Sequence, residues 1–102
     1  MASYGFHSGA AEEYLAATRY YLDQASPLVA ASFVAAVEAA IQTLLASPTI
    51  WPVVEEPQIR RYLLSQFPYS IYYRWEPDQD RVAIYAVMHF NQRPGYWRER
   101  IT

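Results

Sequence analysis

The side chains best suited to chemistry in this 102-residue chain are eight arginines and two histidines, because the sequence contains neither lysine nor cysteine. His89 could transfer a proton or contact a phosphate, since imidazole titrates near neutral pH. Its alternative role is structural, through a hydrogen bond that fastens the loop after its strand. His7 lies where a strand is expected to meet a helix, and the sequence favours a structural role for it.

Arg60 and Arg61 are candidates for contact with a partner or target. Neighbouring residues on a strand point to opposite faces of the sheet, so these two guanidinium groups cannot line one site. One of them is expected to pair with Glu55 or Glu56, and the other to meet the partner. Arg74 has the same two options, because acidic residues follow it closely in the sequence.

The ten tyrosines suit either base stacking or packing. Proteins that bind single-stranded RNA stack bases on aromatic rings, but tyrosine is also common on half-buried strands and in protein interfaces. We expect exposed roles for Tyr72, Tyr85 and Tyr96. The tyrosines expected in the core are Tyr14, Tyr20, Tyr21 and Tyr73.

Composition excludes several kinds of site. Without cysteine the chain has no disulfide, thiol nucleophile or cysteine-bound zinc, and two histidines are too few for a histidine-rich metal centre. Three glycines provide no phosphate-binding loop. The acidic pairs Glu12–Glu13 and Glu55–Glu56 are expected to be solvated. The sequence therefore predicts no cofactor and no metal.

Charge is distributed unevenly along the chain. Residues 1–58 contain one arginine and six acidic residues, whereas residues 59–102 contain seven arginines and four acidic residues. This imbalance predicts that an acidic partner or a polyanion meets the second half. The alternative is that the arginines only border a sheet.

The length predicts one domain over residues 1–102. No uninterrupted apolar run approaches the roughly 20 residues of a membrane helix, and no signal peptide is apparent. We therefore expect a cytoplasmic protein without a membrane partner.

Two helices and four strands are expected to position these side chains. Alternation at 4–7 predicts a first strand, Ser8 can cap the next helix, and Ser26 with Pro27 marks a second helix that ends before Ser47. The proline-containing segment 47–57 is expected to be a loop. The later elements are strands at 59–64, 69–75 and 81–90, a turn at 76–80, and a short helix or tail at 96–102.

The resulting order is β-α-α-β-β-β, an α+β fold in which a helical hairpin packs on one face of a largely antiparallel sheet. The apolar stripe expected on the first helix is Ala11, Tyr14, Leu15, Thr18, Tyr21 and Leu22. In the strand at 69–75, alternate residues should face the helices, namely Ile71, Tyr73 and Trp75. The residues expected to face away are Ser70, Tyr72 and Arg74.

Seven segments, in order, carry a family resemblance. They are Tyr4-x-Phe6-His7-x-x-Ala10-x-x-Glu13, Ile59-Arg60-Arg61, Phe67-Pro68-Tyr69, Ile71-Tyr72-Tyr73, Val82-Ala83-Ile84, Ala86-Val87-x-His89 and Arg93-Pro94-x-x-Trp97. Together they resemble the RelE/ParE superfamily of toxins from bacterial type II toxin–antitoxin and plasmid-stabilisation systems. The resemblance implies a growth-inhibiting toxin that a cognate antitoxin neutralises, with a fold that agrees with the predicted one.

RelE-like members cut messenger RNA on the ribosome, whereas ParE-like members inhibit DNA gyrase. RNA cleavage needs a base for the 2′-hydroxyl, stabilisation of phosphate charge and an acid for the leaving oxygen. The resemblance makes His89, Arg93 and Tyr96 the candidate catalytic residues, with Arg74 to stabilise phosphate charge. The missing lysines, and Ser70 where such members often carry arginine, favour the gyrase branch. Ribosome-dependent RNA cleavage and a non-toxic binding module remain the alternatives.

Antitoxins of this superfamily wrap an extended or helical tail over the toxin, and such tails order on binding. The candidate residues for contact with this partner or with the target are Arg60, Arg61, Tyr72 and Tyr85. In the C-terminal segment Trp97 is expected to be buried and to hold Arg93 and Tyr96 beside His89, on the surface that faces the target.

Overall fold

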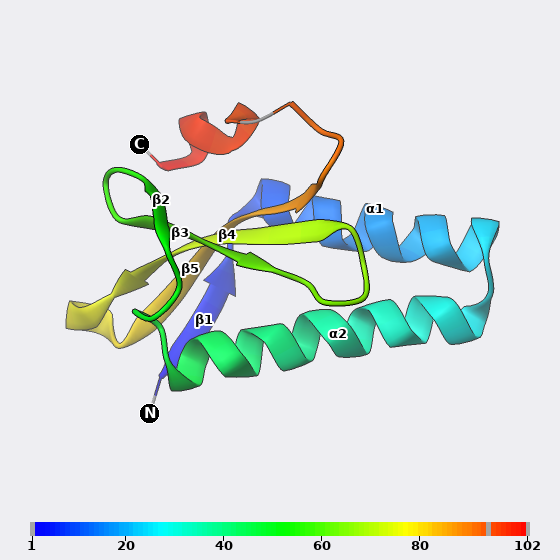
Figure 1. Ribbon diagram of the computed structural model, residues 1–102, viewed down its shortest axis with the longest axis horizontal. Coiled ribbons are helices and arrows are strands. Elements are labelled where there is room, and N and C mark those ends of the chain that lie inside the picture. The colour runs from blue at the N-terminus through cyan, green and yellow to red at the C-terminus, as the bar shows by residue number, and fades with distance from the viewer. Residues whose placement is uncertain (1, 94, 102) are drawn as a thin grey trace.

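A computed structural model of the chain describes residues 2–93 and 95–101, so Pro94 of the predicted turn lies outside the described residues. The two long helices run side by side and pack against the sheet, and the C-terminal segment lies over the opposite face of that sheet (Figure 1). The elements are β1 (Ser3–Phe6), α1 (Ser8–Gln24), α2 (Pro27–Ala46), β2 (Val53–Glu55), β3 (Ile59–Leu63), β4 (Tyr69–Glu76), η1 (Pro77–Gln79), β5 (Arg81–His89) and η2 (Tyr96–Ile101).

The sheet contains five strands in the order β1-β5-β4-β3-β2. β1 pairs parallel with β5, and the other neighbours are antiparallel, which confirms the predicted α+β fold and largely antiparallel sheet. β2 was not predicted, because its three residues lie in a segment with three prolines that reads as a loop. Its pairing with β3 is irregular, and so gives no clear alternation in the sequence.

The two helices begin at different kinds of cap. In α2 the Ser26 hydroxyl accepts a hydrogen bond from the Val29 N–H at 3.1 Å, and Pro27 occupies the first turn, as predicted. In α1 the cap is His7, whose Nδ1 accepts from the Gly9 N–H at 3.0 Å. Ser8 was the expected cap, so that prediction was wrong by one residue, while the structural role of His7 is confirmed.

The face of α1 that is buried differs from the predicted apolar stripe. Its fully buried residues are Ala10 and Ala17, while Leu15 is half exposed. The small side chains let α1 approach the sheet closely, and Glu13 lies one turn from each of them on the same face. The stripe was assigned from the larger side chains, several of which lie at the rim of the core.

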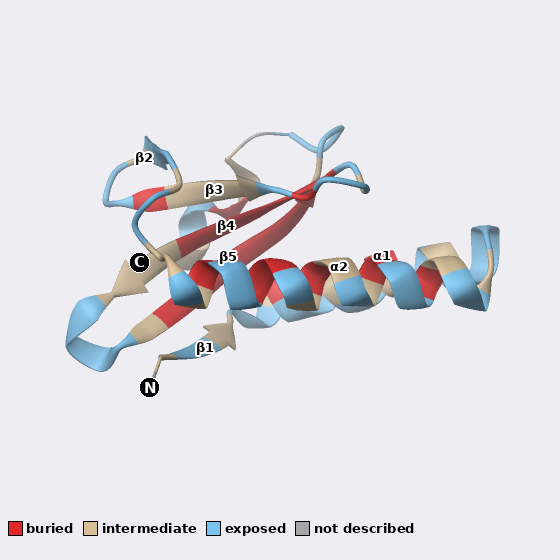
Figure 2. Cartoon of the chain, turned by 60° about the horizontal axis from the view of Figure 1, so that its bottom comes forward, coloured by how far each residue is buried: buried red, intermediate tan, exposed pale blue. Residues whose placement is uncertain are grey.

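The main core fills the space between α2 and the sheet. Figure 2 shows the buried face of α2 turned toward buried β4 and β5. Ile71 and Tyr73 are completely buried in this cluster and Trp75 packs against it, as predicted. Each large apolar side chain buried in this way contributes about 1.5–3 kcal/mol to the free energy of folding. The large buried side chains of α2 are Phe33, Val37, Ile41 and Leu44.

Among the described residues α2 is the one helix long and apolar enough to cross a membrane by length and composition. Its most apolar face is the one that packs in the core, which accounts for this composition in a globular domain.

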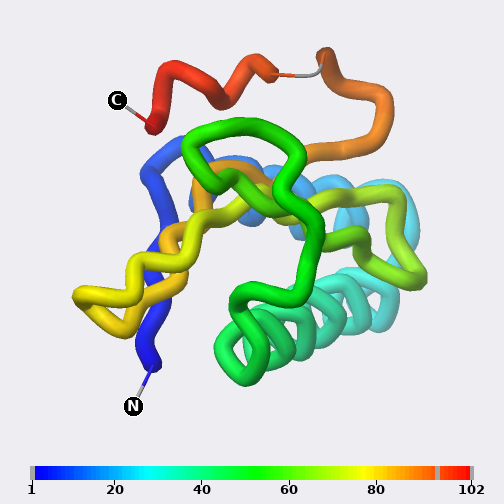
Figure 3. The backbone as a smooth tube through the Cα atoms, turned by 60° about the vertical axis from the view of Figure 1, so that its left-hand side comes forward, coloured from blue at the N-terminus to red at the C-terminus, as the bar shows by residue number. Residues whose placement is uncertain are grey.

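The second face of the sheet carries a smaller apolar cluster beneath η2. Trp97 is 3% exposed, and its ring lies 4.7 Å from the Tyr72 ring, which confirms the predicted burial of Trp97. Tyr72 and Tyr85 are buried in the same cluster, so their expected exposure was wrong. The cause is tertiary, because η2 folds back over strands distant from it in sequence (Figure 3).

Candidate functional site

A groove of about 540 Å³ opens between α1 and the C-terminal end of β5. His89 ends β5 at this point, and the loop that follows forms the outer wall. The residues that line the groove are Glu13, Ala16, Ala17, Tyr20, Tyr69, Val87, His89, Asn91 and Gln92. Tyr20 is therefore a groove residue and largely exposed, not the core residue predicted from the sequence.

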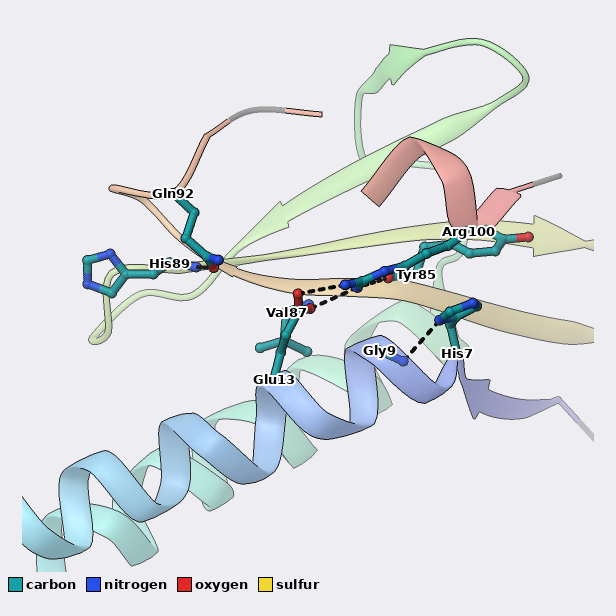
Figure 4. A network of polar contacts seen from close by, with 8 residues as sticks. All are labelled: His7, Gly9, Glu13, Tyr85, Val87, His89, Gln92 and Arg100. Atoms are coloured by element: carbon teal, nitrogen blue, oxygen red, sulfur yellow. Dashed lines mark hydrogen bonds and ion pairs between the residues drawn. The ribbon is translucent and has the colours of Figure 1, made fainter. Parts of the chain in front are cut away.

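His89 is held by the loop that it begins. Its Nδ1 accepts a hydrogen bond from the Asn91 N–H at 3.0 Å, and its ring meets the Tyr69 ring edge-on at 5.0 Å. The backbone N–H of His89 donates to the Gln92 side-chain oxygen at 3.3 Å (Figure 4). The structural role expected as the alternative for His89 is therefore present. With Nδ1 as the acceptor, a neutral imidazole carries its proton on Nε2.

Glu13 is the centre of a polar network that links α1, β5 and η2 (Figure 4). Its carboxylate accepts hydrogen bonds from the Val87 N–H at 3.0 Å and from the Arg100 guanidinium at 3.0 and 3.1 Å. Arg100 also donates to the Tyr85 carbonyl at 2.9 Å. The Glu13 and Arg100 side chains are only 17% and 18% exposed, so the prediction of a solvated Glu13 was wrong.

This network closes an open stretch of strand edge. β1 covers β5 only as far as Ile84, and the register between β4 and β5 skips Tyr85. The skipped residue shifts the alternation, so that the Tyr85 C=O and the Val87 N–H point outward beyond the end of β1. Arg100 and Glu13 supply the hydrogen bonds that a longer β1 would have supplied.

The sequence contained a signal for Glu13 that was missed. Glu13 lies at helical spacing between Ala10 and Ala17, the two buried residues of α1. A charged residue within a buried stripe requires a partner of opposite charge. That partner is Arg100, 87 positions later, which local pattern does not identify.

Tyr96 lies in the same region and is poorly placed to donate a proton. Its hydroxyl is buried and makes no hydrogen bond of ordinary geometry with the described residues. Burial and the adjacent Glu13 carboxylate raise its pKa well above the usual value for tyrosine. The Arg100 guanidinium lies 5.2 Å from the centre of its ring. An exposed role for the Tyr96 hydroxyl was therefore wrong.

Arg74 lies far from His89. In the β4–β5 register Arg74 is opposite Ala83, whereas His89 is opposite Tyr69. Six residues along a strand span roughly 20 Å, so the two side chains belong to different parts of the surface. Arg74 lies 3.7 Å from Glu76 and 5.9 Å from the centre of the Tyr85 ring. The fold does not bring the candidate phosphate-stabilising arginine to the candidate base.

Arg60 and Arg61 point to opposite faces, as expected, but neither pairs with an acid among the described residues. The Arg60 guanidinium donates to the carbonyls of Thr49 and Trp51 at 2.9 and 2.6 Å, so it fastens the loop before β2. Glu55, the expected partner, binds Arg98 of η2 at 2.7 Å. That ion pair is exposed, so Glu55 keeps contact with solvent as predicted while it binds Arg98.

The family model for the ParE toxin of type II toxin–antitoxin systems (parDE) matches residues 4–94 of the chain. The chain belongs to this family. The toxin is also similar to a chain from the chromosomal ParDE system of P. aeruginosa, with a TM-score of 0.72 and 20% identity, over 87% of this chain and 95% of the other.

Two further structures share the fold of this ParE-family toxin. The isolated E. coli RelE toxin aligns with a TM-score of 0.64 and 16% identity over 100% of both chains. A chain of the intact E. coli RelBE toxin–antitoxin complex aligns with a TM-score of 0.63 and 16% identity, over 91% of this chain and all of that one. No curated protein sequence matches significantly.

Most of the positive charge in the second half of the toxin is neutralised within the fold. Four arginines there form ion pairs and Arg60 binds carbonyls. Arg61 and Arg93 have neither kind of partner among the described residues. Arg93 is exposed in the loop after His89, as the sequence predicted. The four paired arginines are Arg74, Arg81, Arg98 and Arg100.

Proposed function

We propose that this toxin acts on DNA gyrase when it is free and is silenced by a cognate antitoxin. The match of residues 4–94 to the ParE toxin family is the observation that carries the proposal. The chain has no lysine to serve the RNA-cleaving chemistry of the RelE branch.

The positions of the candidate catalytic groups further support the gyrase branch. RNA cleavage needs phosphate stabilisation, a base and an acid within reach of one phosphate. Here Arg74 lies on β4 opposite Ala83 near the start of β5, whereas His89 ends β5. The Tyr96 hydroxyl is buried beside Glu13. Three groups dispersed in this way are poorly arranged to cleave RNA. Binding to a protein target does not require them to meet at one phosphate.

On this proposal the target meets the end of the molecule formed by the loop after β5. Arg93 supplies an exposed unpaired charge there, and His89 sets the shape of the loop through its hydrogen bond to Asn91. Trp97 and Tyr96 fix the segment that follows. The toxin would act in the cytoplasm, where gyrase and the antitoxin are both present.

The decisive experiment is to induce the toxin in a bacterial host and follow plasmid supercoiling and protein synthesis together. Gyrase inhibition predicts that negative supercoiling falls before translation, and that purified toxin blocks supercoiling by purified gyrase. Arg93→Ala should abolish both effects without loss of folding, whereas Arg19→Ala, an exposed arginine on α1, should retain them.

Two results would contradict the proposal. Codon-positioned cuts in messenger RNA with purified ribosomes, with gyrase unaffected, would assign the toxin to the RNA-cleaving branch. Normal growth with abundant folded protein would indicate a non-toxic binding module.

A further inference from the structure

Two arginines of η2 each lay a guanidinium group against a glycine. Arg98 covers Gly95 and Arg100 covers Gly9, so closely that a Cβ added at either glycine would overlap the guanidinium. The Arg100 side chain is only 18% exposed, and its contact is part of the packing of η2 on α1. The Arg98 side chain is 59% exposed, so its contact with Gly95 lies at the surface of the toxin.

Glu55 holds Arg98 in place from β2, which lies next to η2 (Figure 3). The Arg98 Nε lies 2.7 Å from both carboxylate oxygens of Glu55, and a terminal nitrogen of Arg98 lies 2.7 Å from one of them. A fork of this kind fixes the orientation of a guanidinium as well as its distance. Glu55 is anchored in turn, because it pairs with Ile59, which is completely buried in the cluster beneath η2.

The stability that this ion pair contributes is small, because water reaches both of its side chains. Its geometry is nevertheless closely defined, by several short bonds to one carboxylate. What the pair determines is therefore the place of the Arg98 guanidinium and of the backbone that this guanidinium covers.

Arg98 contacts Gly95 with its backbone as well as its side chain. Its N–H donates to the Gly95 carbonyl at 3.1 Å, and Gly95 has a φ of 81°, a conformation that favours glycine. A guanidinium without other bonds could move away from an added Cβ, but the bonds to Glu55 oppose that movement. The ion pair therefore confines Gly95 in addition to its own backbone conformation.

Gly95 ends the loop that follows His89, which we call the target-facing loop. The other end of this loop is held at His89, whose ring accepts from the Asn91 N–H and whose carbonyl accepts from the Gln92 N–H at 3.0 Å. Arg93 is exposed between these two attachments. A charged side chain on a loop fixed at both ends has less freedom to lose when it binds a target.

We propose that Glu55 and Arg98 are positioning residues for the target-facing loop, which hold Gly95 and thereby orient Arg93. The inference rests on the proposed action on gyrase and adds to it one residue from β2 and one from η2. Neither side chain has to touch the target. A loop that is ordered before binding loses less conformational entropy in the complex, so the pair increases the affinity without adding a contact.

Backbone amide relaxation, measured by nuclear magnetic resonance on the free toxin, tests whether the pair holds the loop. The order parameters of Arg93 and Gly95 should fall in Glu55→Gln from the roughly 0.85 of rigid backbone toward 0.6. Glu76→Gln is the matched control, because it breaks the surface ion pair with Arg74 at the far end of β4. Unchanged order parameters in Glu55→Gln would overturn the proposal.

Inhibition of supercoiling by purified gyrase tests whether the held loop serves the target. Glu55→Gln and Arg98→Lys should each raise the toxin concentration needed by roughly threefold to tenfold, because the freed loop must be ordered on binding. Arg98→Lys keeps the positive charge and loses only the fork. Glu76→Gln should change that concentration by less than about twofold.

A direct contact between Arg98 and the target predicts a different pattern. Glu55→Gln would then free the Arg98 guanidinium, so inhibition would be preserved or strengthened. Arg98→Lys would retain most of the inhibition, because the charge that meets the target would still be present. That pattern would overturn the positioning role.

The outcomes separate this inference from the proposed function. Failure of the unaltered toxin to block gyrase would refute the proposed function, and the order parameters would still decide whether the pair holds the loop. Loss of loop order with full inhibition would overturn the inference and preserve the function. Loss of order and of inhibition in Glu55→Gln and Arg98→Lys, but not in Glu76→Gln, is the expected result.

Discussion

At one edge of the sheet β1 ends opposite Ile84, and at the other β2 begins opposite Arg60, just after Pro52 accepts a hydrogen bond from the Arg61 N–H. Both short strands leave the longer strand beside them half covered. On β5 the outward Val87 N–H and Tyr85 C=O are bonded by Glu13 and Arg100. On β3 the outward groups of Leu63 have no partner among the described residues.

The difference shows how a small domain controls its strand edges. An edge with free N–H and C=O groups pairs readily with another chain. The β5 edge is closed by two half-buried side chains from α1 and η2, which join three distant segments. The β3 edge leaves the backbone groups of Leu63 without partners among the described residues, beside Arg61, which makes no ion pair there. One edge is closed by side chains, and the other is left open.

The largest expected effect is that of replacing Trp97, the buried side chain that anchors η2 on the second face of the sheet. Trp97→Ala should lower the free energy of unfolding by roughly 3–5 kcal/mol, because it empties a buried site against Tyr72. Chemical denaturation would measure it. A loss below about 1 kcal/mol would mean that η2 contributes little to either edge.

Matched arginine deletions test the comparison itself. Arg100→Ala should destabilise the fold by about 2–3 kcal/mol, since it leaves the Glu13 carboxylate half-buried without its cation. Arg61→Ala should change stability by no more than about 0.5 kcal/mol. Equal losses for the two variants in thermal and denaturant unfolding would refute the distinction between a closed and an open edge.

Alkaline pH should loosen the segment that leads to β2. The Tyr73 hydroxyl donates to the Pro48 carbonyl at 2.8 Å, and burial raises the pKa of Tyr73 to about 12 from its ordinary 10.0. Since the folded pKa is the higher one, this contribution is complete below pH 10.0 and is lost as the pH rises toward 12. The contribution of this shift to the free energy of unfolding is roughly 3 kcal/mol.

Tyr73→Phe removes this titration, so its stability should fall less steeply across the same pH window. Tyrosinate absorbance followed together with far-ultraviolet circular dichroism would measure ionisation and unfolding at once. Ionisation of all ten tyrosines before any unfolding would contradict the burial of Tyr73.

The smallest expected effect concerns the exposed ion pair between η2 and β2. A hydrogen bond from Arg98 holds the pKa of Glu55 below its ordinary value of 4.5. A lowered pKa means that the contribution is present above that ordinary value and is lost as the pH falls through the folded one. Glu55→Gln should therefore change stability only slightly near neutral pH and flatten its decline in acid.

A melting-temperature series in acid would compare Glu55→Gln with the unaltered toxin. Added salt should shrink the difference, because exposed pairs are screened. A Glu55→Gln variant as damaging as Arg100→Ala would show that η2 depends equally on both of its ion pairs.

The sequence by itself determined the order of the elements other than β2, and most of the main core. Ser26 and Pro27 fixed the start of α2, and strict alternation placed Ile71 and Tyr73 toward the helices. These features follow from local propensity and from the period of apolar residues, which the chain carries regardless of its tertiary contacts. The family resemblance was likewise readable from short segments in order.

Only the tertiary structure decided which polar groups meet and which strand edges stay open. Glu13 finds Arg100 and Glu55 finds Arg98 across 87 and 43 positions, and η2 buries tyrosines that alternation alone turned outward. Pairings at such distances leave no periodic signal, because any of seven arginines in the second half could have met either acid. The open edge at Leu63 depends on where the three-residue strand β2 begins, directly after Pro52, which becomes visible only once β2 and β3 lie side by side.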